Sequence, residues 1–230
     1  MLNRIACINN WRCIHRESLL LLFLFDSMRK RILYLFILAL IAMAGALIAW
    51  HHWTHRYDNL IVAVAQKHGL DPLLVKAIVY EESFFSPRAQ SSQKAVGLMQ
   101  VTPVVAQELM ETLRTRTLAQ ALADVSGGPQ NADLSFEEAL SDPATSLHVG
   151  CWYLQTLLNR YRDEPEPLAV ALAAYNAGPS NVERWASNAD RFNLSRDEFI
   201  NRIQFPVTRD YVKKIIERYD DYKRDQDIKQ

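Results

Sequence analysis

An uncharged run near the N-terminus constrains this chain more than any other feature. From Ile32 to Trp50 the sequence reads ILYLFILALIAMAGALIAW, and the basic triplet RKR lies directly before it. A helix of about 20 apolar residues crosses the roughly 30 Å hydrocarbon core of a bilayer. Positive charge stays on the cytoplasmic side. We therefore expect 32–50 to be a transmembrane anchor, 1–31 to be cytoplasmic, and the remainder to lie in the periplasm, outside the inner membrane.

A cleaved signal sequence is the alternative, which would release a soluble periplasmic protein. The small residues Ala44 to Ala46 fit a signal peptidase site, but the apolar run is longer than the usual core of about 7–15 residues. We favour the retained anchor. Met28 stands just before the basic triplet, and MRKRILYLF reads as a complete start. We interpret 1–27 as an upstream extension that is not translated.

Composition narrows the class of the remaining chain. The 230 residues can bury a core, and 49% hydrophobic with 23% charged residues indicates a folded protein. Lys+Arg and Asp+Glu balance at 26 each, which argues against nucleic acid as a partner. Cys151 stands alone beyond the apolar run, between packing residues. No spaced His/Cys cluster occurs, so we expect neither a metal nor a cofactor.

Helix start and stop signals recur along the chain. Asp58, Asp71 and Asp142 are candidate N-caps, the last two followed by Pro, and Ser180 and Ser195 begin capping boxes. EPLAVALAAYNAGP is almost uncharged and rich in Ala, which favours a central helix. TRDYVKKIIERYDDY places Val212, Ile215, Ile216 and Tyr219 on one face. We expect one mainly α domain over 57–222, with a polar tail at 223–230 and an exposed loop within 110–141 that either edges a cleft or is a surface insertion.

Two adjacent carboxylates, Glu81 and Glu82, end the helix predicted from Pro72. Residues three, four and seven positions earlier share a helix face with each of them, and for both glutamates these are apolar. Helical periodicity therefore does not choose between them. A carboxyl against a hydrophobic wall has a raised pKa, as a proton donor near neutral pH requires. The alternative is a helix end at which both side chains reach water.

The blocks that follow carry a resemblance. EESFFSPRAQSSQKAVGLMQVTP and AYNAGP are similar to the soluble lytic transglycosylase family, which cleaves murein and has a goose-lysozyme-like fold. DPATSLHVGCWYL and QFPVTRDYV resemble two further family blocks. The likeness covers roughly Asp58 to Tyr222 in one order. Several ordered blocks are more specific than any single motif.

The resemblance implies an activity and an acid. Family members cleave the β-1,4 bond between N-acetylmuramic acid and N-acetylglucosamine, and the C6 hydroxyl of the sugar closes onto C1 to leave a 1,6-anhydro end. An internal acceptor removes the need for the second carboxylate of a lysozyme. The family acid directly precedes Ser, which identifies Glu82, first as acid and then as base. Glu81 is then a rim charge, and peptidoglycan strands are the expected partner; cell-wall or secretion-machinery proteins remain unidentified by the sequence.

The same resemblance implies the substrate-binding residues. Ser91 and Gln100 should bind sugar or acetamido groups, and Ser83 and Asn176 complete the set, Asn176 by fixing a turn. Tyr175 should approach Glu82 and hold its carboxyl. Gly97 is expected to let the backbone approach the ligand, and Gly178 to adopt a left-handed cap conformation. For Met99 and Phe85 we prefer ordinary core packing.

Departures from the family pattern leave subsite preference open. Ser146 stands where the family usually has Asn, so a local hydrogen bond is expected to be weaker or to come from Thr145. Thr102 replaces a Met, and QFP at 204–206 is a looser match. Two rival functions remain. A lysozyme that uses water needs another acid, for which Glu108 and Asp124 are candidates, and a non-catalytic murein-binding scaffold would lose the acid, whereas Glu82 is intact.

Overall fold

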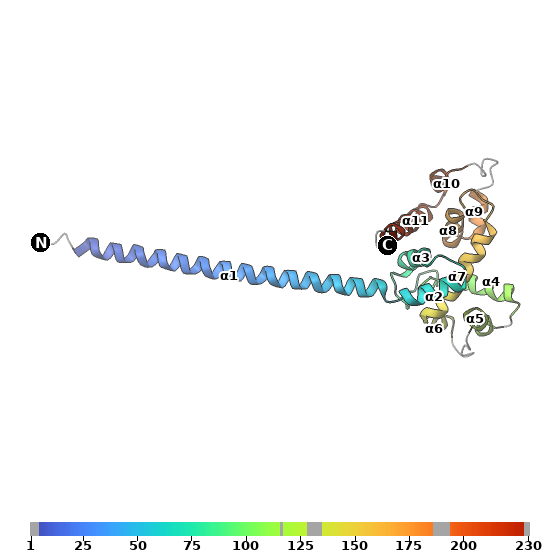
Figure 1. Cartoon of the computed structure of the whole chain (residues 1–230), viewed down its shortest axis with the longest axis horizontal. Coiled ribbons are helices and arrows are strands. Elements are labelled where there is room, and N and C mark those ends of the chain that lie inside the picture. Colours follow the sequence, from blue (N-terminus) through green and yellow to red (C-terminus); the bar gives the residue numbers. More distant parts are fainter. Residues whose placement is uncertain (1–4, 116, 128–134, 186–193, 228–230) are drawn as a thin grey trace. The chain divides into compact units, whose positions relative to one another are not determined.

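The computed structural model describes residues 5–115, 117–127, 135–185 and 194–227, and divides into two compact units, 1–53 and 54–230. Helix α1, Ile5–His55, is labelled in Figure 1 and extends well beyond the predicted span 32–50. Its side chains from Met28 to Trp53 are exposed, and this part is long and apolar enough to cross a membrane by length and composition. A signal sequence would meet the same criterion.

The second unit contains helices and isolated β-bridges, with no strand among its described residues, as the sequence predicts. The helices are α2 Asp58–Lys67, α3 Pro72–Ser83, α4 Pro103–Leu113, α5 Leu118–Ser126, α6 Phe136–Ser141, α7 Pro143–Arg160, α8 Pro167–Ala177, α9 Pro179–Trp185, α10 Arg196–Arg202 and α11 Pro206–Asp227. Two predicted N-caps are confirmed. Asp71 accepts from Leu73 N at 2.8 Å, and Asp142 accepts from Thr145 N at 2.8 Å.

The other predictions of helix ends and loops have mixed outcomes. Asp58 is the first residue of α2 rather than its N-cap, and its carboxylate pairs with Lys76. Ser180 lies inside α9, because that helix begins at Pro179. The capping box at Ser195 is present, and the predicted polar tail from 223 is helical as far as Asp227. The loop expected within 110–141 falls partly on 128–134, which lies outside the described residues.

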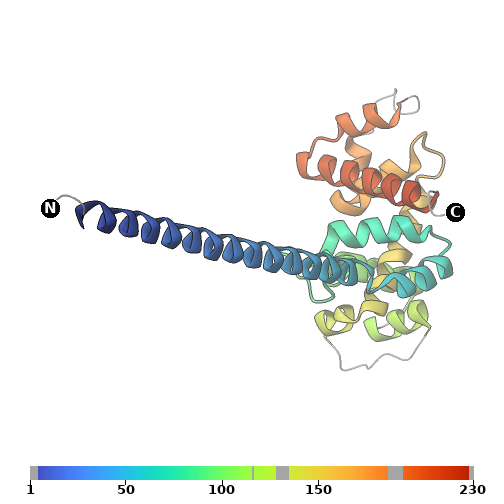
Figure 2. The same cartoon turned by 60° about the vertical axis from the view of Figure 1, so that its left-hand side comes forward.

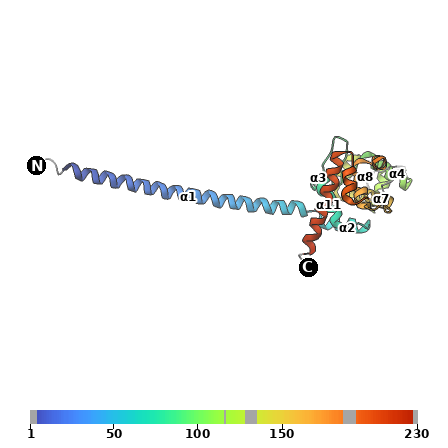
Figure 3. The same cartoon turned by 90° about the horizontal axis from the view of Figure 1, so that it is seen from above.

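Helix α8 lies at the centre of the second unit's core, as its small apolar sequence predicts. Ala169 to Ala174 are each at most 5% exposed, and α7 and α11 pack on this helix. The predicted apolar face of α11, Val212 to Tyr219, is likewise buried. Helix α11 also runs beside α3, as Figures 2 and 3 show, and this contact between distant parts of the sequence builds one side of the candidate site.

The segment between α3 and α4, residues 84–102, is compact although it contains no helix or strand. Val96 forms isolated bridges with Gln90 and with Val101, and Leu98 is fully buried. Phe85 and Met99 are both 0% exposed, which confirms that they are core residues. The segment therefore packs as part of the core, and the side chain of Ser83 at the end of α3 donates to its Leu98 O at 2.9 Å.

Candidate active site

Glu82 occupies the last turn of α3, where the chain changes direction. Phe84 and Phe85, which follow it, both have positive φ, so the helix stops directly after Ser83. The carboxylate oxygen Oε1 of Glu82 accepts a hydrogen bond of 2.5 Å from the hydroxyl of Tyr211 on α11. Burial raises the pKa of Glu82 to about 7, against the opposing effect of the Tyr211 hydrogen bond, and the neighbouring charge of Glu81 raises it further. Glu82 can therefore hold a proton at neutral pH.

Glu81 is not the rim charge that the sequence analysis expected. Its Oε1 accepts from Nε and Nη2 of Arg218 at 2.9 and 2.6 Å, and its side chain is only 14% exposed. Adjacent residues on a helix point in different directions. The two glutamates thus meet different residues of α11, and a phenol reaches Glu82 whereas a guanidinium neutralises Glu81.

Tyr175 does not make the predicted hydrogen bond to Glu82. Its hydroxyl donates to the backbone oxygen of Met99 at 2.8 Å, and a hydroxyl has only one proton to donate. The charge of Glu82 nevertheless contributes, after burial, to a raised pKa of Tyr175, so the two groups are near each other. Tyr175 fastens the 84–102 segment to α8, and Tyr211 takes the place that we had expected it to fill.

Met99 is held from several sides. Its N–H donates to Ser146 Oγ on α7 at 3.2 Å, its side chain fills the space that a Cβ on Gly150 would need, and its sulfur lies 3.9 Å from that of Cys151. Ser146 itself supplies the hydrogen bond that was expected to be weaker or to come from Thr145. Burial raises the pKa of Cys151 to about 12, which suits a packing residue.

Gly97 is needed for a different close approach from the one predicted. It has a φ of +85°, and a Cβ there would lie 2.2 Å from the backbone oxygen of Leu140 and 2.5 Å from Ser146 Oγ. The absence of a side chain thus lets the segment pack against α6 and α7. Gly178 has positive φ as expected, but its ψ of 146° is not that of the left-handed helical cap.

The remaining predicted site residues bind groups of the protein itself. Ser83 Oγ donates to Leu98 O at 2.9 Å, and the exposed Ser91 accepts from Ala95 N at 3.1 Å. The Gln100 amide nitrogen donates to two backbone oxygens of the segment, at 3.1 Å each. Asn176 Oδ1 accepts from Thr208 of α11 at 2.7 Å. These bonds hold the protein together, and the predicted contacts with sugar stay predictions.

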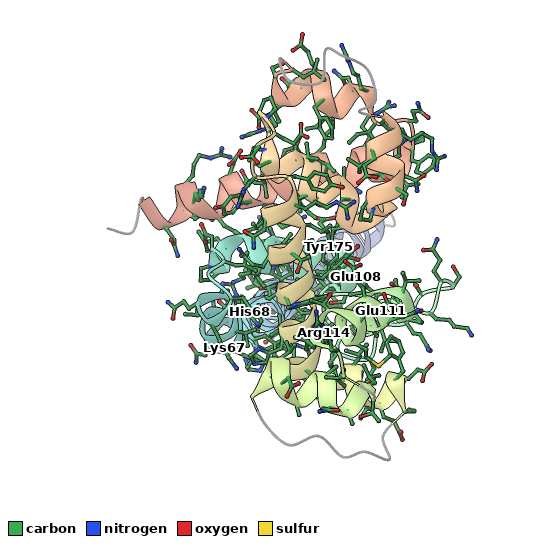
Figure 4. The ribbon with its side chains drawn as sticks, turned by 90° about the vertical axis from the view of Figure 1, so that its right-hand side faces the viewer. Lys67, His68, Glu108, Glu111, Arg114 and Tyr175 are labelled. Carbon is green, nitrogen blue, oxygen red and sulfur yellow. The ribbon has the colours of Figure 1, made fainter. Side chains whose placement is uncertain are left out.

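Glu108 and Asp124, the candidates for a second acid, come from α4 and α5. Figure 4 labels Glu108 and Tyr175. Tyr153 lies near both, because its ring centroid is 5.4 Å from that of Tyr175 and the charge of Glu108 contributes, after burial, to the raised pKa of Tyr153. The charged group that raises the pKa of Glu82 is Glu81, not Glu108. Within the described part of the chain, no three His, Cys, Asp or Glu residues gather as a metal site.

Tyr211 and Arg218 are the residues that sequence reasoning missed. Both belong to α11, which was interpreted through its apolar face and, at its start, as part of the family-like block QFPVTRDYV, without a role for either residue. A signal was present, because the two residues are seven positions apart and so share a face two turns long. What the sequence did not show is that this face meets the end of α3, more than a hundred residues earlier.

Comparisons with known proteins show to which family the chain belongs. The family model of the transglycosylase SLT domain matches residues 59–197. A putative soluble lytic murein transglycosylase of Haemophilus influenzae is 31% identical over 76% of this chain and 26% of its own length. The membrane-bound lytic murein transglycosylase F of Desulfosudis oleivorans is 33% identical over 55% of this chain and 23% of its own.

A solved structure is similar in fold. An inactive mutant of the lytic transglycosylase Slt from Pseudomonas aeruginosa superposes with a TM-score of 0.61 at 27% identity, over 76% of this chain and 25% of that one. The chain thus spans about a quarter of the length of these relatives. The match lies in the helical, lysozyme-like unit that carries Glu82. This chain belongs to the transglycosylase SLT domain family.

Proposed function

We propose that this protein is a lytic transglycosylase that cleaves the β-1,4 bond between N-acetylmuramic acid and N-acetylglucosamine in peptidoglycan and leaves a 1,6-anhydromuramic end. One observation carries the proposal. Glu82, at the position of the family acid, has a carboxyl whose pKa is raised to about 7 and whose Oε1 is held by Tyr211. A carboxyl that is half protonated near neutral pH can donate a proton and later accept one.

The hydrogen bond from Tyr211 supports a different task for each oxygen of Glu82. Tyr211 donates to Oε1, which leaves Oε2 as the oxygen that can carry the proton to the glycosidic oxygen. Loss of that proton leaves a carboxylate, which the Tyr211 hydrogen bond stabilises. The carboxylate can then accept the proton of the C6 hydroxyl as that oxygen bonds to C1 of the same sugar. The protein ends the reaction with Glu82 protonated again.

The pH dependence of this first step has a definite sign. Cleavage needs the protonated form of Glu82, and the pKa of this group is about 7. We therefore expect kcat/KM to fall about tenfold for each pH unit above that value. Ser83, Ser91, Gln100, Tyr175 and Asn176 are proposed to line or support the substrate site, where Ser91 and the amide oxygen of Gln100 would bind sugar or acetamido groups.

Mass spectrometry of the fragments released from purified peptidoglycan tests the proposal. Anhydromuramic ends are expected in all products. Reducing ends would instead identify a lysozyme that uses water, and Glu108→Gln and Asp124→Asn would then show which carboxylate directs it. A lack of any product from the folded protein would favour the non-catalytic murein-binding scaffold.

Location forms a second part of the proposal. We infer that α1 anchors the protein in the inner membrane and that the unit from Thr54 onward lies in the periplasm, where peptidoglycan is found. The apolar, exposed part of α1 and the likeness to membrane-bound lytic murein transglycosylase F support this inference. Recovery in the membrane fraction, together with sensitivity to protease added from the periplasmic side, is expected. A soluble form that begins near Leu47 would show a cleaved signal.

A further inference from the structure

The ion pair between Glu81 and Arg218 is more ordered than a surface pair. Two guanidinium nitrogens bind the same carboxylate oxygen, at 2.9 and 2.6 Å, and the guanidinium carbon lies 3.4 Å from the centroid of the Tyr80 ring. The side chain of Arg218 is 28% exposed and that of Glu81 is 14% exposed. Tyr222, which lies on the same helix as Arg218, also contacts the guanidinium. A planar cation held by both a carboxylate and an aromatic face keeps one position.

This ion pair lies next to the hydrogen bond between Tyr211 and Glu82. Glu81 and Glu82 are consecutive on α3, while Tyr211 and Arg218 are two helical turns apart on α11. The same face of α11 therefore binds both glutamates, Tyr211 through a neutral phenol and Arg218 through a permanent positive charge. A charge change at one position is transmitted to the other over a short distance in a partly buried setting, where Coulomb interactions are weakly screened.

Among the residues that the structure describes, the ionisable groups beside Glu82 come from α3, α8 and α11. Tyr211 of α11 binds its carboxylate, Tyr175 of α8 lies near it, and Glu81 directly precedes it on α3. Both phenols are neutral at working pH, because burial raises their pKa values well above the ordinary value. Glu81 is therefore the neighbour that acts on Glu82 through its charge, and the guanidinium of Arg218 binds that charge.

We infer that Arg218 is a positioning residue that, by binding Glu81, sets the pH range over which Glu82 can deliver its proton. The inference rests on the proposed role of Glu82 as the acid. When Arg218 binds Glu81 and offsets its negative charge, Glu82 gains and loses its proton near neutral pH. Without the cation, the bare carboxylate of Glu81 makes Glu82 hold its proton to higher pH. Without Glu81, the unpaired cation has the opposite effect.

The test is a charge-swap cycle read as pH profiles of kcat/KM with purified peptidoglycan. Glu81→Gln is expected to move the alkaline limb to lower pH and Arg218→Gln to move it to higher pH, each by roughly half a unit. The double variant, which carries neither charge, should return close to the parent. Arg224→Gln is the matched control, because Arg224 pairs with Asp221 on the exposed face of the same helix and should leave the limb in place.

A second readout separates this inference from the proposed function. Carbon NMR titration of the Glu82 carboxyl, without substrate, should give the same two opposite shifts even if no cleavage occurs. Single variants that shift the limb in the same direction, or that lower activity and melting temperature without moving it, would show that the pair is only structural and would overturn the inference. Should Arg218→Gln fail to fold, Glu81→Gln alone decides, since an unmoved limb in that variant is equally contrary.

Discussion

The two sides of Glu82 are built in different ways. On the α11 side, Tyr211 and Arg218 use their side chains to bind the carboxylates of α3. On the other side, the 84–102 segment uses its polar groups on its own backbone and on α7 and α8, as the bonds of Gln100 and Met99 show. The contacts from α11 are electrostatic and affect how strongly Glu82 holds its proton. The 84–102 segment instead packs closely and fixes the backbone on its side of Glu82.

The difference explains why a single hydroxyl matters in one place more than in another. A hydrogen bond to a group that changes its charge during the reaction can alter the barrier, while one to a backbone carbonyl stabilises the fold equally throughout. We therefore expect substitutions on the α11 side to change turnover and pH dependence. Substitutions in the 84–102 segment should mainly change stability. The four predictions below test this division.

The largest effect is expected for Glu82→Gln. The amide keeps the shape of the side chain but cannot donate or accept the transferred proton, so turnover should fall by about 10³-fold or more. Rates of anhydromuramic product formation measure this loss, and circular dichroism checks the fold. Glu81→Gln should keep substantial activity at pH 6. If the two variants behaved the other way round, the identity of the acid would be wrong.

Gly97→Ala should be the most damaging change in the segment. A Cβ there would meet Leu140 O at 2.2 Å, and the backbone has positive φ, so we expect the free energy of unfolding to fall by about 2–4 kcal/mol. Gly69→Ala is the matched control, since Gly69 also has positive φ but nothing within 4 Å of its Cβ, and about 1 kcal/mol is expected. Equal losses in denaturant titrations would mean that the packing at Gly97 does not matter.

Tyr211→Phe removes the hydrogen bond to Glu82 and keeps the ring. Turnover should fall about 10- to 100-fold, which corresponds to roughly 1.4–2.7 kcal/mol. The Tyr211 bond lowers the pKa of Glu82, so its loss should raise that pKa and move the alkaline limb of kcat/KM to higher pH. Kinetics over pH 5–9 measure both quantities. An unmoved limb would remove Tyr211 from the proton chemistry.

Tyr175→Phe should have the smallest effect on turnover, less than about fivefold, because its hydroxyl binds Met99 O rather than Glu82. The free energy of unfolding should fall by about 1 kcal/mol, the usual contribution of one buried hydrogen bond. Parallel turnover and thermal unfolding measurements compare this variant with Tyr211→Phe. A hundredfold loss of turnover at unchanged stability would restore the direct contact with Glu82 that the sequence first indicated.

Much of the local structure could be predicted from local residue patterns. The Asp71–Pro72 and Asp142–Pro143 helix starts are confirmed because a side-chain cap and a preset φ act within a few residues. A failed prediction of this kind has a tertiary cause. Asp58 has the chemistry of an N-cap, but Lys76 pairs with its carboxylate and the helix begins at Asp58 itself. A cap signal says that a residue can cap, and tertiary partners decide whether it does.

The sequence by itself determined the apolar segment, the mainly helical class and the glutamate that precedes Ser83, since these depend on hydropathy, capping chemistry and a motif read along the chain. Only the tertiary structure decided which tyrosine holds Glu82. Tyr175 and Tyr211 are both tyrosines near the ends of motif blocks, and nothing local distinguishes them. The packing of α11 along α3 brings Tyr211 to the carboxylate of Glu82 and Arg218 to Glu81. Met99, which packs against α7, accepts the hydrogen bond of the Tyr175 hydroxyl on its backbone oxygen. Such contacts depend on how helices far apart in sequence pack together, which no short pattern encodes.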